Sequence, residues 1–172
     1  MKAAVFCKNT EIYALRRKAS GNMTQVIRPA EKRDAYRIAE ILVFNYRLNF
    51  YPVFRDDAFY FDEMQVKSVA EDYLADGEAL QNTYVYDDGA VKGMIQISGD
   101  EIKKLFVEPV LQGSGIGEKL LNHAVESRGA AWLWALEKNE RAIKFYRKHG
   151  FRLTDEKKLE DGTEAYLVRM ER

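Results

Sequence analysis

Hydrophobic positions in the first half of the chain recur mainly at helical spacing. Over residues 31–50 they fall at Ala35, Ile38, Ala39, Leu42 and Val43, which predicts a helix with one apolar face. This part of the chain is expected to form a strand over 24–29 ended by Pro29, the helix 31–50, an aromatic loop 51–61, and a second helix 66–76 that closes near Gly77.

The pattern after residue 80 changes to strand-like runs separated by turn residues. A hairpin is predicted around Asp88-Gly89, and a third strand follows and ends at Pro109. The remaining expected elements are an amphipathic helix 115–127, a buried strand 130–137, a short helix 140–149 ended by Gly150, and two strands joined by a charged turn. This order predicts a mixed α/β (α+β) single domain on a mostly antiparallel sheet flanked by helices.

The first 22 residues are interpreted as an N-terminal extension to a domain spanning 23–172. The stretch "KASGN" separates the two parts, and Met23 follows it as a second candidate start. A short hairpin is predicted around Lys8-Asn9-Thr10.

Composition narrows the functional classes. The 172 residues carry 27 Lys and Arg against 27 Asp and Glu, so the formal net charge of zero argues against broad nucleic-acid or membrane binding. Cys7, the single cysteine, rules out an internal disulfide framework. With no apolar run of membrane-spanning length and no signal-peptide pattern, a cytoplasmic protein is expected.

The stretch "VEPVLQGSGIG" (107–117) places glycines between a predicted strand and a predicted helix, where backbone N–H groups can hold phosphates. A dinucleotide loop fails because its third glycine position falls on Glu118, and a nucleotide-hydrolase loop fails because no Gly-Lys-Ser/Thr follows. The remaining pattern is Q-x-x-G-x-G at Gln112, Gly115 and Gly117. Taken alone, this pattern is equally typical of a flexible turn that starts a helix.

Two stretches together carry a resemblance. "LFVEPVLQGSGIGEKLLNHA" resembles the pyrophosphate-loop motif of the GNAT superfamily of acetyl-CoA-dependent N-acetyltransferases. "LEKNERAIKFYRKHGF" resembles that family's N-x-x-A-x-x-F-Y-x-x-x-G-F helix. The resemblance is sharp over 101–151 and extends in element order over 24–172. It implies the GNAT fold, with a cofactor cleft at a splayed strand pair.

The resemblance implies a role for each matched position. Backbone groups of Leu105, Phe106 and Val107 would pair with the pantetheine arm of acetyl-CoA like an added strand. The N–H groups of the loop would hold the pyrophosphate, and those residues are Gln112, Gly113, Ser114, Gly115, Ile116 and Gly117. Asn139 would approach the cofactor arm, with Ala142 and Phe145 packing along it.

Acetyl transfer to an amine needs a base, an oxyanion donor and an acid. Tyr146 is predicted to protonate the leaving thiolate, although "FY" at helical spacing is also typical of core aromatics. Glu101 matches the base of the histone-type branch of the family, and it is equally readable as an exposed strand-end carboxylate. The base position of the branch that acetylates protein N-termini falls on Trp134, so that assignment does not transfer.

The aromatic stretch 44–63 is expected to determine which amine acceptor binds. Its aromatic side chains are expected to line a pocket in which a cationic amine meets a carboxylate, from Asp56, Asp57, Asp62 or Glu63. The alternative is that these aromatics pack a core or a homodimer interface. The predicted function is transfer of an acetyl group to a primary amine of a small molecule, peptide or protein, with no metal. The competing function is a non-catalytic acyl-CoA-binding regulatory module.

Overall fold

The computed structural model describes residues 26–172, so Cys7, the predicted hairpin and the extension 1–22 lie outside the described residues. Within that range seven strands form one sheet in the order β1-β2-β3-β4-β5-β7-β6, antiparallel except between β4 and β5. The strands are β1 (Val26–Pro29), β2 (Thr83–Asp87), β3 (Val91–Ser98), β4 (Glu101–Val107), β5 (Trp132–Leu136), β6 (Arg152–Leu159) and β7 (Tyr166–Glu171). The prediction of a mixed, mostly antiparallel sheet flanked by helices is confirmed.

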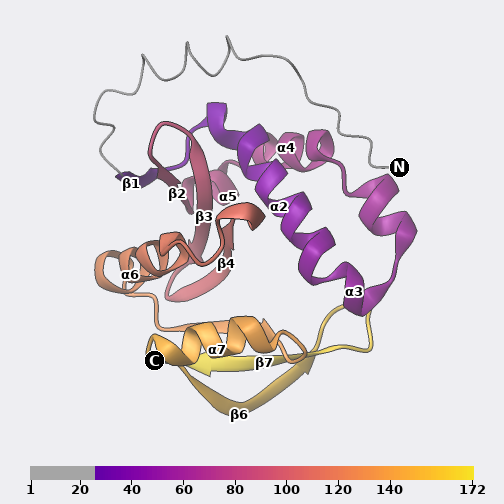
Figure 1. Cartoon of the computed structure of the whole chain (residues 1–172), viewed down its shortest axis with the longest axis vertical. Coiled ribbons are helices and arrows are strands. Elements are labelled where there is room, and N and C mark those ends of the chain that lie inside the picture. Colours follow the sequence, from indigo (N-terminus) through magenta and orange to yellow (C-terminus); the bar gives the residue numbers. More distant parts are fainter. Residues whose placement is uncertain (1–25) are drawn as a thin grey trace, which may run out of the picture.

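Helices cover both faces of the sheet, and successive side chains of β3 point to the two faces in turn. Met94 packs into a core beneath α2 and α4, whereas the neighbouring Ile95 packs into a second core beneath α6. The helical elements are η1 (Lys32–Asp34), α2 (Ala35–Asn49), α3 (Tyr51–Phe54), η2 (Ala58–Glu63), α4 (Val66–Ala75), α5 (Gly77–Gln81), η3 (Pro109–Leu111), α6 (Ile116–Arg128) and α7 (Glu140–Lys148). In Figure 1, α7 lies in front of β7, and the long α2 runs down to α3.

The structure corrects one local prediction and adds one short helix. The segment 51–61, expected as a loop, forms the short helix α3 and then η2, a π-helical turn; Arg47 donates to the carbonyls of Tyr60 (2.9 Å) and Met64 (3.2 Å) there. The helix expected over 66–76 is α4, which ends next to Gly77 as predicted. The unpredicted α5 then begins at Gly77, because the Asp76 carboxylate accepts from the N–H groups of Glu78 and Ala79. In both places, hydrogen bonds to a polar side chain outside the turn organise the backbone, and composition alone does not predict them.

An ion-pair network fixes the start of α2 to the sheet. Arg28 on β1 donates to the buried Asp34 at 2.7 and 3.0 Å and to Asp87 on β2 at 2.8 Å. Burial alone would raise the pKa of Asp34, but the bonds from Arg28 and the Glu31 N–H outweigh it and lower that pKa. The network therefore sets where α2 begins over the sheet.

The strands β4 and β5 part soon after they meet. Their parallel register joins only Glu101 with Trp132 and Ile102 with Leu133. In the same region the β3–β4 register shifts, and β4 carries one extra residue at Lys103. Beyond Ile102 the two strands diverge, and this gap carries the candidate site.

Candidate functional site

A cavity of about 380 Å³ lies where β4, the glycine loop, α2 and α7 meet. Its volume falls within the usual range for small-molecule and cofactor sites, roughly 300–1,000 Å³. The lining residues are Asn45, Asn49, Leu105, Phe106, Val107, Gln112, Gly113, Gly115, Gly117, Glu118, Asn139, Arg141, Ala142, Phe145, Tyr146, Lys148 and His149. The structure therefore brings most of the predicted cofactor residues to one place.

The end of β4 presents backbone groups toward the gap. The Glu108 N–H donates to the Lys92 carbonyl at 2.8 Å, and the register pairs Val107 with Gly93. Residues of an antiparallel strand alternate between bonding the partner strand and facing away from it. The N–H and C=O groups of Leu105 and Val107 therefore face β5, whereas those of Phe106 face β3. The expected backbone role of Phe106 does not fit this geometry; Phe106 lines the cavity with its side chain instead.

The glycine loop runs from η3 into the first turn of α6. Gly113 and Gly115 have φ angles of 87° and 85°, a left-handed conformation that side-chain-bearing residues rarely adopt. The N–H groups of Gln112 and Ser114 already donate to the carbonyls of Pro109 and Leu111, at 3.3 and 3.2 Å. The first N–H groups of α6, from Ile116 onward, have no helical partner. Of the six predicted diphosphate donors, Gln112 and Ser114 therefore already have backbone acceptors within the loop.

Helix α7 contributes the opposite wall. Asn139 caps the helix, because its Oδ1 accepts from the Ala142 N–H at 3.0 Å. Its side-chain amide can still donate to a ligand. Ala142, Phe145 and Tyr146 follow at positions i, i+3 and i+4, which places them on one face of the helix.

Tyr146 is 8% exposed, and its ring packs edge-on against Phe145 (5.2 Å between centroids) and Phe151 (5.7 Å). Burial raises the pKa of Tyr146, so the phenol stays protonated at neutral pH. Tyr146 is therefore a core aromatic that also borders the cavity, and its role as the acid stays a prediction.

Glu101 lies at the bottom of the gap rather than in the lining of the cavity. It pairs with Trp132, one residue before the strands part, and its carboxylate forms an ion pair with Lys103. Its neighbour Ile102 belongs to the core beneath α6, so Glu101 projects to the opposite face, which α2 and α4 cover further along the sheet. Only 9% of Glu101 is exposed, which contradicts its reading as an exposed carboxylate.

Several lining residues were missed from the sequence. Asn45 and Asn49 come from α2, and Arg141, Lys148 and His149 come from α7. Asn45 had a detectable signal: it interrupts the apolar face that Ile38, Ile41 and Leu42 form. His149 is hydrogen-bonded through Nδ1 to the Phe145 carbonyl (2.8 Å), and its ring lies tilted against the Phe145 ring (4.5 Å between centroids).

Residues 26–172 lack the features of two further classes of site. That range contains no group of three or more His, Cys, Asp or Glu side chains able to hold a metal ion. Over the same residues, no helix is both long and apolar enough to cross a membrane.

The comparisons with known proteins agree with this geometry. Residues 79–153 match the family model described as an acetyltransferase (GNAT) domain. The peptidyl-lysine N-acetyltransferase YjaB of Salmonella typhimurium is 28% identical over 102 residues, covering 59% of this chain and 69% of that protein. YjaB of Escherichia coli is 32% identical over 74 residues, 43% of this chain and half of that protein.

Solved structures share the whole fold. The solution structure of apo YjaB from Escherichia coli superposes with a TM-score of 0.70 at 24% identity, covering 87% of this chain and 97% of that chain. The PaiA N-acetyltransferase of Thermoplasma acidophilum, solved with coenzyme A, gives 0.62 at 17% identity, covering 87% and 100%. Residues 79–153 thus match a GNAT acetyltransferase domain, and the chain is similar in sequence to peptidyl-lysine N-acetyltransferases and in fold to solved N-acetyltransferases.

Proposed function

We propose that the protein transfers an acetyl group from acetyl-CoA to the side-chain amine of a lysine in a peptide or protein. The observation that carries the proposal is a cavity in which the glycine loop, the end of β4 and Tyr146 meet, beside the point where β4 and β5 diverge. The YjaB relatives are peptidyl-lysine N-acetyltransferases, which supports the choice of a peptide lysine over a small-molecule amine.

The residues present fit coenzyme A along its length. The N–H groups at the start of α6 and the helix dipole would bind the diphosphate, at glycines whose φ angles favour bare backbone. Outward-facing backbone groups of Leu105 and Val107 would pair with the amides of the pantetheine arm. Arg141 and Lys148, exposed at the rim, would add positive charge for the phosphates.

The reaction needs three functions from this chain. The neutral lysine nitrogen bonds to the thioester carbonyl carbon, while the Val107 N–H donates to the carbonyl oxygen. The carbon–sulfur bond then breaks, and the Tyr146 phenol gives its proton to the leaving sulfur. The proton lost by the amine passes to Glu101 through water, because Glu101 lies at the bottom of the gap rather than in the cavity lining.

The acceptor would enter over α2, α3 and the β6–β7 connection. Tyr46 stacks on Phe50 (4.8 Å), and both contact Phe106 of the cavity lining (5.6 and 6.4 Å). Burial raises the pKa of Tyr46, and the nearby Glu160 carboxylate adds to the effect. An aromatic wall with a carboxylate beside it suits a lysine ammonium before it loses its proton.

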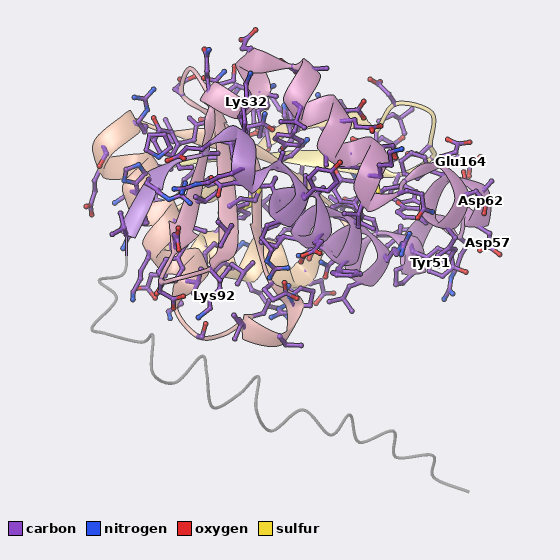
Figure 2. All side chains as sticks on the ribbon, turned by 90° about the horizontal axis from the view of Figure 1, so that it is seen from above. Lys32, Tyr51, Asp57, Asp62, Lys92 and Glu164 are labelled. Carbon is purple, nitrogen blue, oxygen red and sulfur yellow. The ribbon has the colours of Figure 1, made fainter. Side chains whose placement is uncertain are left out.

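Acidic side chains extend this surface outward. Figure 2 shows Asp57, Asp62, Glu164 and Tyr51 gathered at one end of the molecule. Asp57 already accepts from the Tyr51 hydroxyl at 2.8 Å, and Asp56 accepts from the Phe59 N–H at 3.0 Å. Asp62 and Glu164 are therefore better placed than Asp56 or Asp57 to meet basic residues of an acceptor peptide.

The deciding experiment is calorimetric titration with acetyl-CoA, with ATP and NAD as controls, followed by mass spectrometry of lysine peptides incubated with the enzyme. We expect binding of acetyl-CoA alone, lost in Gly115→Val, and a mass gain of one acetyl group on peptide lysine. Binding without any acetylated product would support the non-catalytic module instead. Absence of acetyl-CoA binding by the wild-type protein would refute the proposal.

A further inference from the structure

A fully bonded asparagine connects α2 to the cofactor side of the cavity. Asn45 is 1% exposed, and its Nδ2 donates to the carbonyls of Ile41 (2.8 Å) and Val107 (2.9 Å). Its Oδ1 accepts from Gln112 Nε2 (2.8 Å) and from Asn49 Nδ2 (3.3 Å). We call Asn45, Asn49, Gln112 and the Val107 carbonyl the Asn45 network.

Only an amide suits this position. A primary amide has two N–H donors and an oxygen with two lone pairs, and all four are used by Asn45. An apolar residue would leave the Val107 carbonyl and the Gln112 amide without their buried partner, and a carboxylate would have no donors. Hydrogen bonding, rather than packing, therefore explains why Asn45 lies in the otherwise apolar face of α2.

The partners of Asn45 are the two parts that would hold the cofactor. The Val107 carbonyl faces the gap between β4 and β5 and accepts a hydrogen bond from Asn45. This bond holds the neighbouring backbone groups of Leu105 and Val107 in register. Gln112 opens the glycine loop, and its side chain reaches back to Asn45 and also toward the Val107 carbonyl (3.4 Å). A second attachment reinforces the junction, because Arg37 on α2 forms an ion pair with Glu108.

We infer that Asn45 is a positioning residue that holds the end of β4 and the start of the glycine loop in the geometry that binds acetyl-CoA. The inference rests on the proposed function, since it names what organises that same site. On this inference, α2 forms the wall beside the lysine acceptor and also sets the affinity for the donor, acetyl-CoA. Asn45 acts through Val107 and Gln112.

The test compares Asn45→Ala and Gln112→Ala with a buried control, Thr83→Val. Thr83 is fully buried, and its hydroxyl donates to the Ala79 carbonyl at 2.8 Å, away from the cavity. Each variant is measured for its melting temperature without ligand, its Kd for acetyl-CoA by calorimetry, and its KM for the acceptor peptide.

Asn45→Ala is expected to raise the Kd for acetyl-CoA about tenfold, as loss of one or two preorganising hydrogen bonds implies. Gln112→Ala should also raise the Kd for acetyl-CoA. The double variant should bind acetyl-CoA no more weakly than Asn45→Ala alone. Thr83→Val should lower the melting temperature and leave the Kd unchanged. The acceptor KM should stay the same in every folded variant.

A folded Asn45→Ala protein with the wild-type Kd would overturn the inference. If Asn45→Ala does not fold, Gln112→Ala serves as the test instead, because the Gln112 side chain lies in a loop. An unchanged Kd for acetyl-CoA in Gln112→Ala would then overturn the inference. Additive effects in the double variant would also overturn it, since they would show that the two residues act separately. Failure of the wild-type protein to bind acetyl-CoA is a separate result, which removes the proposed function and this inference together.

Discussion

Replacing Tyr146 with phenylalanine separates its structural role from its proposed chemical role. The change removes one oxygen and keeps the ring, which packs against Phe145 and Phe151 at centroid distances of 5.2 and 5.7 Å. The phenol borders the cavity, and its oxygen is not among the buried atoms left without a partner. We therefore expect the free energy of unfolding to change by less than about 1 kcal/mol.

The expected catalytic loss is much larger. General acid catalysis contributes about 10²- to 10⁴-fold, so the activation free energy of Tyr146→Phe should rise by roughly 3 to 5 kcal/mol. The loss should appear in kcat, because the phenol acts on the leaving sulfur and not on the bound ground state. Burial raises the pKa of Tyr146, so the ratio of wild-type to variant kcat should stay constant between about pH 7 and 9.

The assay is acetylation of a lysine peptide under saturating acetyl-CoA, with urea unfolding and calorimetric Kd measured on the same samples. A kcat within a factor of about three of the wild-type value would refute the acid role, because even the weakest general acids contribute more. A loss in stability together with kcat would instead assign Tyr146 to the core.

Three further changes test other parts of the structure. Glu101→Gln should lower kcat at least tenfold with acetyl-CoA affinity unchanged, by about the lower range of general base catalysis; unchanged kcat would leave Glu101 as a strand-end carboxylate. Gly93→Ala should cost about 1 to 3 kcal/mol in urea unfolding, because the added Cβ would approach the Ile116 side chain to 3.0 Å; wild-type stability would show that α6 adjusts freely. Arg28→Met should cost about 3 to 5 kcal/mol by leaving the buried Asp34 unpaired. In the wild-type protein the lowered pKa of Asp34 stabilises the fold above about pH 4, and this stability should disappear as the pH falls further. If Arg28→Met had the same acid unfolding curve as the wild-type protein, the pairing of Arg28 with Asp34 would be contradicted.

The sequence predicted the second half of the domain well because its elements have clear boundaries. Pro109 ends β4, Gly150 follows α7, and the apolar run before Glu137 is short enough to be a strand. The same stretch holds both motifs of the resemblance, so the cavity lining from Leu105 to Tyr146 could be predicted except for Glu118 and Arg141.

The segment between α2 and α4 could not be predicted, because its structure depends on distant partners. The π-helical turn η2 is held by Arg47, and nothing in the local pattern indicates those bonds. The role of Asn45 depends on Val107, 62 residues away. Which backbone groups of β4 face the gap depends on the register with β3, which side-chain pattern alone does not give.

The divergence of β4 from β5 has a consequence for the unliganded protein. Beyond Ile102, the outward groups of Leu105 are those of an exposed edge strand, located in the interior of a sheet rather than at its rim. A bound pantetheine arm would cover that edge, so the ligand would act as a protective cap against pairing with other chains. We expect aggregation during storage to slow as coenzyme A is added, in proportion to the fraction of protein that is bound.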